Sequence, residues 1–186
     1  MSETLVGVDL CNTVADINGE IERYFNVRAE TYPVCGIPND FFSTPAGLAM
    51  FRNAAPFSCA ARVLWNIAKA GCKIIYVTTR PGVAGSVTGQ WLKANNFPSG
   101  QVAFVPRESK ADFITGTGIS CFFEDDPLVV NALMRTEMKF VFVKEWPYNT
   151  GLAGQKVIRF WDWRELMDWP FTKREIKQLF GVSAYP

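Results

Sequence analysis

Short apolar runs alternate with segments of helical periodicity along most of the chain, and this alternation restricts its fold more than any other feature. The apolar runs are residues 5–10, 73–77, 102–105, 120–123, 140–143 and 157–160, the last of which we expect at a sheet edge. Strands separated by helices favour βαβ units with right-handed crossovers. The sequence therefore predicts an α/β protein with a mainly parallel sheet flanked by helices.

The helical patterns and one interruption define the expected domain organisation. Helices are predicted at residues 15–25, 58–70, 84–95, 109–115, 129–135, 163–167 and 172–180, with Ser58 as an N-cap and Pro127 at a helix start. Residues 26–57 break the pattern, are rich in Pro, Gly, Phe and Asn, and hold one short predicted helix at 46–52. We expect one domain over residues 1–186, with 26–57 as a small insertion.

The chain contains no histidine, which removes several kinds of chemistry. Ser-His-Asp and Cys-His nucleophiles and histidine-ligated zinc sites are excluded. Acid–base chemistry is left to carboxylates, Lys, Tyr or Cys.

Charge and cysteine usage bear on partners and location. The net charge is +1, so charge alone attracts neither a nucleic-acid polymer nor a membrane surface. No apolar run approaches the roughly 20 residues of a membrane span. Five widely spaced cysteines are typical of reduced thiols, and the N-terminus does not resemble a signal peptide, so we expect a cytoplasmic protein.

Polar groups follow four of the predicted strands, where the site of a parallel sheet lies. They are Asp9 to Asp16, then Thr78, Thr79 and Arg80, then Arg107 to Lys110, and then Glu124, Asp125 and Asp126. Each alone has an ordinary explanation as a cap, a turn residue or a solvated charge. Their combination and order favour a shared site.

Phosphoryl transfer is the chemistry that this set suits. A carboxylate such as Asp9 can attack phosphorus and form an aspartyl-phosphate. Carboxylates from the first and fourth strand ends can hold Mg²⁺, which binds oxygen ligands and a substrate phosphate. Lys110 can offset the remaining charge, and Thr78 with backbone N–H groups can hydrogen-bond the phosphate oxygens.

The same residues resemble the motifs of the haloacid dehalogenase superfamily. Asp9-x-Cys11-Asn12-Thr13 is similar to its first motif, usually Asp-x-Asp-x-Thr. Thr78, Lys110 and the pair Glu124-Asp125 resemble the second, third and fourth motifs in the right order. The resemblance implies a three-layer fold with a small cap insertion.

Within this superfamily the resemblance is strongest to the 5′(3′)-deoxyribonucleotidases and covers most of residues 4–168. Its further matches are Asp16, the stretch 41–56, Gln90-Trp91-Leu92, 146–149 and 160–163. It implies Asp9 as nucleophile and metal ligand, the Cys11 carbonyl as a metal ligand, and Thr78, Thr79 and Lys110 as phosphate ligands. Glu124 and Asp125 complete the Mg²⁺ site, and which of them binds directly stays open.

Cys11 is the departure from the family pattern, because it replaces the aspartate that protonates the leaving group and activates water. A thiol has a reference pKa of about 8.5, so it donates a proton weakly and is a poor base when neutral. Losing general acid–base help typically costs about 10²–10⁴-fold in rate. Two functions therefore remain open, a phosphomonoester hydrolase and a catalytically weakened phospho-ligand binding or regulatory protein. A dehalogenase is disfavoured by the Glu124-Asp125 pair.

The insertion holds the candidate substrate contacts. Its aromatic residues are Tyr32, Phe41, Phe42, Phe51 and Phe57. They either pack the insertion or stack on a flat group such as a nucleobase. We expect a small phosphorylated metabolite, with a (deoxy)nucleotide 5′-monophosphate as one candidate and Phe41, Phe51 and Arg52 as contacts. The oligomeric state stays open, with a homodimer as one option.

Overall fold

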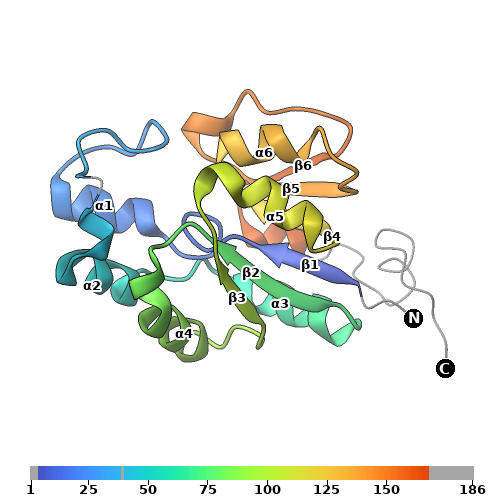
Figure 1. Cartoon of the computed structure of the whole chain (residues 1–186), viewed down its shortest axis with the longest axis horizontal. Coiled ribbons are helices and arrows are strands. Elements are labelled where there is room, and N and C mark those ends of the chain that lie inside the picture. Colours follow the sequence, from blue (N-terminus) through green and yellow to red (C-terminus); the bar gives the residue numbers. More distant parts are fainter. Residues whose placement is uncertain (1–3, 39, 168–186) are drawn as a thin grey trace.

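A six-stranded parallel sheet forms the centre of the molecule in the computed structural model, which describes residues 4–38 and 40–167 (Figure 1). The strands are β1 (Leu5–Val8), β2 (Lys73–Thr78), β3 (Gln101–Phe104), β4 (Ile119–Glu124), β5 (Phe140–Lys144) and β6 (Val157–Phe160). Their order is β3-β2-β1-β4-β5-β6, and all five neighbouring pairs are parallel. The predicted parallel α/β class is confirmed, with β6 at an edge.

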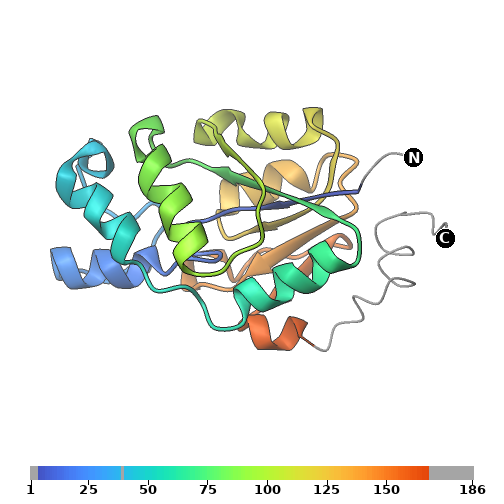
Figure 2. The ribbon, with the colours of Figure 1, turned by 90° about the horizontal axis from the view of Figure 1, so that it is seen from below.

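Helices cover both faces of this sheet. The α-helices are α1 (Ile17–Phe25), α2 (Pro45–Asn53), α3 (Ala60–Lys69), α4 (Gly85–Ala94), α5 (Lys110–Gly116) and α6 (Pro127–Leu133). Short 3₁₀ helices are η1 (Phe41–Ser43), η2 (Gly82–Ala84), η3 (Arg107–Ser109), η4 (Pro147–Asn149) and η5 (Trp163–Leu166). The α5 and α6 helices contact one face, while α3 and η5 lie on the other (Figure 2).

Three local expectations differ from the structure. The strand predicted at 5–10 ends at Val8, because the next residues form a loop in which Asn12 has a positive φ of 61°. Ser58 is not the N-cap of α3; Cys59 holds that position, with a φ of 65° and no side-chain cap bond. The segment predicted as a helix at 163–167 is the 3₁₀ helix η5. The helix expected at 172–180 lies outside the described residues.

Stacked aromatic rings tie η5 to the sheet. The Phe123 ring lies 4.5 Å from the Phe142 ring and 5.0 Å from that of Trp163, centroid to centroid, and all three side chains are buried. Rings of this size bury roughly 150–250 Å² each. This packing holds the end of the described chain against the strand that carries Glu124.

The stretch 26–57 and α1 lie beyond the carboxyl ends of the strands (Figures 1 and 2). The α2 helix begins at Pro45, and the Thr44 hydroxyl accepts a hydrogen bond from the Gly47 N–H at 3.2 Å, which is a typical N-cap. The Trp91 indole of α4 donates to the Ala54 carbonyl at 2.8 Å. The insertion is thereby fixed above the strand ends.

Within the described residues, no helix is long and apolar enough to cross a membrane.

Candidate active site

The loop after β1 carries Asp9, whose residue is only 3% exposed. Two indole N–H groups hold this loop from the far end of the sequence. Trp146 donates to the Asn12 carbonyl and Trp163 to the Thr13 carbonyl, each at 2.8 Å. These bonds allow the left-handed conformation of Asn12 and fix the direction of the loop.

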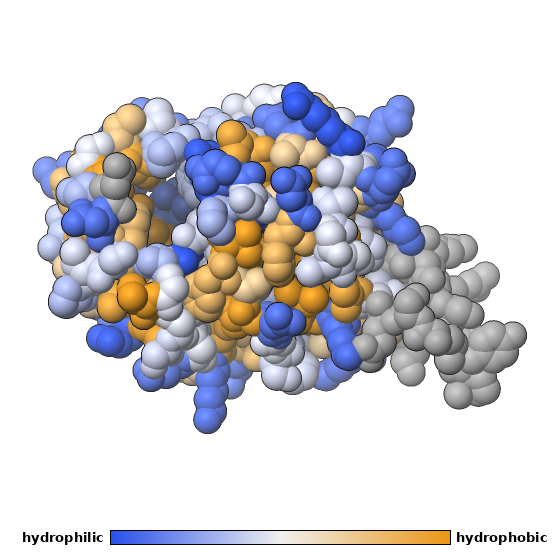
Figure 3. All heavy atoms as spheres, in the orientation of Figure 1, coloured by the Kyte–Doolittle hydropathy of each residue, from blue (hydrophilic) through white to orange (hydrophobic). Residues whose placement is uncertain are grey.

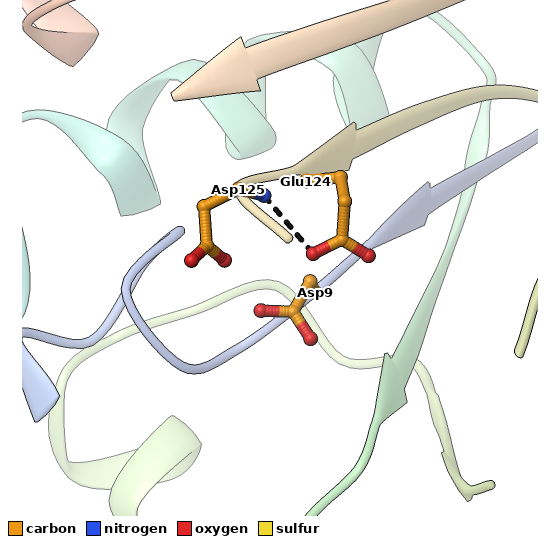
Figure 4. A group of neighbouring side chains, drawn as sticks. All are labelled: Asp9, Glu124 and Asp125. Carbon is orange, nitrogen blue, oxygen red and sulfur yellow. Dashed lines mark hydrogen bonds between the residues drawn. The ribbon is translucent and has the colours of Figure 1, made fainter. Parts of the chain in front are cut away.

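Three buried carboxylates meet at this point. Oxygen atoms of Asp9, Glu124 and Asp125 all lie within 4.8 Å of one another (Figure 4). They meet because β1 and β4 are neighbours in the sheet and end at the same edge. The Nζ atom of Lys110 lies 2.5 Å from Asp9 Oδ1 and 2.8 Å from Glu124 Oε2. One buried ammonium therefore pairs with two of the three buried carboxyl groups.

Burial is the main cause of a raised pKa in each of the three acids. Burial raises the pKa of Asp9, and it raises the pKa of Glu124 to about 7. Burial and the charges of Asp9 and Glu124 raise the pKa of Asp125 well above its usual value. Burial alone would lower the pKa of Lys110, but Asp9 and Glu124 raise it overall.

A divalent cation fits this group of residues. The donors are carboxylate oxygens, which Mg²⁺ and Ca²⁺ prefer, and one ammonium leaves negative charge in excess. Glu124 is already occupied, because Oε1 accepts from the backbone N–H groups of Asp125 and Asp126 while Oε2 faces Lys110.

Asp125 differs, because no Lys or Arg of the described chain forms an ion pair with it. Its Oδ1 accepts from Thr13 Oγ1 at 2.9 Å and its Oδ2 from the Tyr148 hydroxyl at 2.6 Å. The neutral donors orient the carboxylate without neutralising it. The chemistry of this set favours Asp9 and Asp125 over Glu124 as carboxylate ligands.

The Cys11 thiol lies in contact with Arg80. Arg80 Nε donates to Cys11 Sγ at 3.2 Å. Burial raises the pKa of Cys11 and the charge of Asp9 adds to the effect, although Arg80 opposes it. Cys11 is therefore a neutral thiol near pH 7. Thr78 is fully buried, and its hydroxyl accepts from the Arg80 backbone N–H at 3.3 Å.

A cavity of about 490 Å³ opens between the strand ends near Cys11 and Arg80 and the insertion. Its wall includes Cys11, Thr79 and Arg80 at the strand ends and Tyr32, Phe42 and Phe51 from the insertion. Figure 3 shows the surface hollowed between the insertion, at the left, and the rest of the molecule. A space of this size accommodates a small organic phosphate.

Two of the expected substrate contacts lie away from this cavity. Phe41 packs against the end of α1, with its ring centroid 4.8 Å from that of Phe25 and 5.3 Å from that of Tyr24. Arg52 is exposed on α2 and is not part of the cavity wall. Phe51, by contrast, lines the cavity and is buried.

The acidic and basic groups that the sequence placed at one site do lie together, but the sequence gave no role to several of their neighbours. Arg80 was visible only as a charge after Thr78 and Thr79, and Tyr148 only as part of an aromatic stretch. The sequence features that mark these two residues are the end of a strand for Arg80 and the Trp-Pro-Tyr-Asn pattern for Tyr148. Both features indicate where a residue lies in the fold, but they do not reveal which side chains it contacts.

Comparisons with known proteins agree with this geometry. A protein of Bacillus cereus named "Putative nucleotidase" is 31% identical over 166 residues, covering 88% of this chain and 82% of that protein. A protein of the same description from Oceanobacillus iheyensis is 26% identical over 120 residues, covering 63% of this chain and 62% of that protein. No family model matches the chain.

Solved structures share the fold at low identity. A hydrolase of the haloacid dehalogenase family from Deinococcus radiodurans, with bound phosphate and sodium, has a TM-score of 0.62 at 12% identity and covers 98% of this chain and 99% of its own. The D,D-heptose 1,7-bisphosphate phosphatase of Burkholderia thailandensis has a TM-score of 0.55 at 9% identity, covering 87% and 94%.

Proposed function

Because the chain belongs to the haloacid dehalogenase superfamily, among its nucleotidase-like members, we propose that it is a Mg²⁺-dependent phosphomonoester hydrolase acting through Asp9. The observation that carries the proposal is the group of Asp9, Glu124 and Asp125 around Lys110, beside a cavity at the strand ends. This arrangement supports nucleophilic attack on a phosphate whose charge is offset from several sides.

Asp9 is the proposed nucleophile. Its carboxylate attacks phosphorus, the bond to the ester oxygen breaks, and an aspartyl-phosphate forms that water then hydrolyses. Lys110 holds Asp9 in place through the 2.5 Å contact and offsets phosphate charge. Thr78 and Thr79 lie at the end of β2 and supply hydroxyl groups for the phosphate oxygens.

Asp9, Asp125 and the Cys11 carbonyl are the proposed metal ligands, while Glu124 positions Lys110. Bound Mg²⁺ would neutralise the negative charge of these groups and of the incoming phosphate. Thr13 and Tyr148 orient Asp125 toward this task through their hydroxyl groups.

The proposed substrate is a small phosphorylated metabolite, with a nucleoside 5′-monophosphate as the leading candidate. The support is the aromatic part of the cavity wall, formed by Tyr32, Phe42 and Phe51, on which a flat group can stack. We place the reaction in the cytoplasm, as reduced thiols suggest, and propose no nucleic-acid polymer or membrane as a partner.

A phosphatase screen over mononucleotides and sugar phosphates, with Mg²⁺ or with EDTA, tests the proposal. Activity should need Mg²⁺ and should disappear in Asp9→Asn. The matched control Asp112→Asn, an exposed carboxylate on α5, should keep full activity. A fluoroberyllate adduct should form on Asp9. Activity that survives in Asp9→Asn would reject the mechanism.

Cys11 supports a second candidate function, a phospho-ligand binding or regulatory protein. Its thiol stays protonated, because burial raises its pKa, so it lacks the basicity of a carboxylate. In that case Mg²⁺-dependent binding of nucleotides would be measurable by calorimetry while the screen shows no turnover.

A further inference from the structure

Arg80 is a buried cation without a carboxylate partner among the described residues. The residue is 3% exposed. Its Nε donates to Cys11 Sγ and its Nη1 to Thr88 Oγ1, both at 3.2 Å. The third nitrogen, Nη2, is buried and has no hydrogen-bond partner. A buried charge is costly unless an opposite charge or a full set of hydrogen bonds offsets it, so an acceptor on a ligand would complete the hydrogen bonds of Arg80.

The side chain is held rigidly at the cavity wall. Its guanidinium carbon lies 4.4 Å from the centroid of the Phe51 ring and 5.9 Å from that of Trp91. Contacts from a loop, a helix and the insertion therefore fix its position. A guanidinium fixed in this way is pre-organised, and little further order is lost when Nη2 donates to a ligand.

The location of Arg80 identifies the part of the substrate that it meets. Lys110 occupies one oxygen of the Asp9 carboxylate, and neither Lys110 nor Glu124 is part of the cavity wall, which includes Cys11, Thr79 and Arg80. In phosphoryl transfer the attacking and leaving oxygens lie roughly in line across phosphorus. A phosphate attacked by Asp9 from within the protein thus directs its ester oxygen into the cavity, toward Arg80.

We propose that Arg80 is a catalytic residue that stabilises the leaving oxygen through Nη2. This rests on the proposed function of Asp9. As the Asp9–phosphorus bond forms, the phosphorus–ester bond breaks and its electron pair stays on the leaving oxygen. The guanidinium keeps its charge and its protons, and the alkoxide takes its proton from cavity water. Arg80 thereby stabilises the negative charge that develops on the leaving oxygen.

The test compares leaving groups. Arg80→Met keeps the apolar stem against Phe51 and removes the charge. Its turnover of alkyl phosphates should fall about 10²-fold, as for the loss of one oxyanion donor, and its turnover of p-nitrophenyl phosphate less than about fivefold. Arg80→Lys should recover part of the loss. The control Arg62→Met, an exposed position on α3, should match wild type.

An equal loss on both esters in Arg80→Met would overturn the proposal, because a purely structural role lowers all turnover alike. Thermal unfolding distinguishes a structural role from a catalytic one, because a folding defect lowers the midpoint temperature of Arg80→Met. Loss of all activity in Asp9→Asn tests the proposed function independently. If wild type shows no turnover, the affinity of each variant for an alkyl phosphonate monoester is measured instead. Weaker binding by Arg80→Met than by Arg62→Met supports the contact, and equal binding rejects it.

Discussion

Lys110→Met removes the buried ammonium that pairs with Asp9 and Glu124, and its cost in stability follows from the structure. The Nζ atom contacts Asp9 and Glu124, and both partners are almost fully buried. Breaking a buried ion pair by removing one partner costs about 3–5 kcal/mol. We expect Lys110→Met to lose this much free energy of unfolding at pH 8 without Mg²⁺.

The loss of unfolding free energy in Lys110→Met should be smaller at low pH, because the buried acids are then protonated. The pKa of Glu124 in the folded protein is raised to about 7 from 4.5. The stability contributed by its proton is present below pH 4.5 and is lost as the pH rises through about 7. Since the pKa of Lys110 is raised, the lysine stays charged in wild type over this range. Removing Lys110 also removes a charge that lowers the pKa of Glu124, so this carboxyl group binds its proton more tightly in the variant. The proton is fully bound at pH 5, and the loss of stability is therefore smaller at pH 5 than at pH 8.

Urea unfolding of wild type and Lys110→Met at both pH values, in EDTA, measures this effect. The control Lys93→Met, an exposed lysine on α4, should change stability by less than about 0.5 kcal/mol. Mg²⁺ should restore part of the loss at pH 8, because the variant site carries more negative charge. A loss of equal size at both pH values would show that the carboxyl groups are not coupled as the structure indicates.

Three further predictions concern single positions. Cys11→Asp should raise phosphatase turnover at least about tenfold, within the range for general acid–base catalysis, and no gain in steady-state assays would show that the thiol does not limit the rate. Mg²⁺ at about 100 times its Kd should stabilise wild type by roughly 2.7 kcal/mol over EDTA. The rise in midpoint temperature should be larger at pH 8 than at pH 5 and should vanish in Asp125→Asn. A rise that this variant retains would exclude Asp125 as a ligand. Gly7→Ala should lower the free energy of unfolding in urea by about 1–3 kcal/mol, because a Cβ there would lie 2.3 Å from the Phe122 ring. In the control Gly116→Ala the new Cβ meets no atom within 4 Å, and stability should not change. Equal stability of both variants would contradict the packing of β1 on β4.

The sheet and the meeting of Asp9, Lys110 and Glu124 could be predicted because parallel strands end at one edge. The apolar runs identify the strands, and the residues after them must then gather whatever their separation in sequence. Predicted strand ends agree with the structure to about one residue, except that β1 ends two residues early, where the loop after Val8 turns through the positive φ of Asn12. That turn depends on tryptophans more than 130 positions away, which local pattern does not reveal.

Contacts within the site were harder to foresee. Glu124 and Asp125 are neighbours in sequence, and only their partners in space distinguish the one beside Lys110 from the one beside Tyr148. Phe41 and Phe42 are also neighbours in sequence, yet the Phe41 ring packs against α1 and the Phe42 ring lines the cavity. Side-chain direction in irregular segments is set by tertiary packing rather than by periodicity.

The two indole hydrogen bonds to the loop after β1 also determine when this loop can become fixed as the protein folds during translation. The residues joined by the Trp163 bond are 150 positions apart, and those joined by the Trp146 bond 134. Asp9 leaves the exit tunnel among the first residues, but the groups that fix its loop emerge only after most of the chain has been synthesised. A nascent chain that stops before Trp146 has made every strand except β6 and still lacks both bonds. Asp9 is therefore among the first residues translated, and its loop is among the last parts to become rigid.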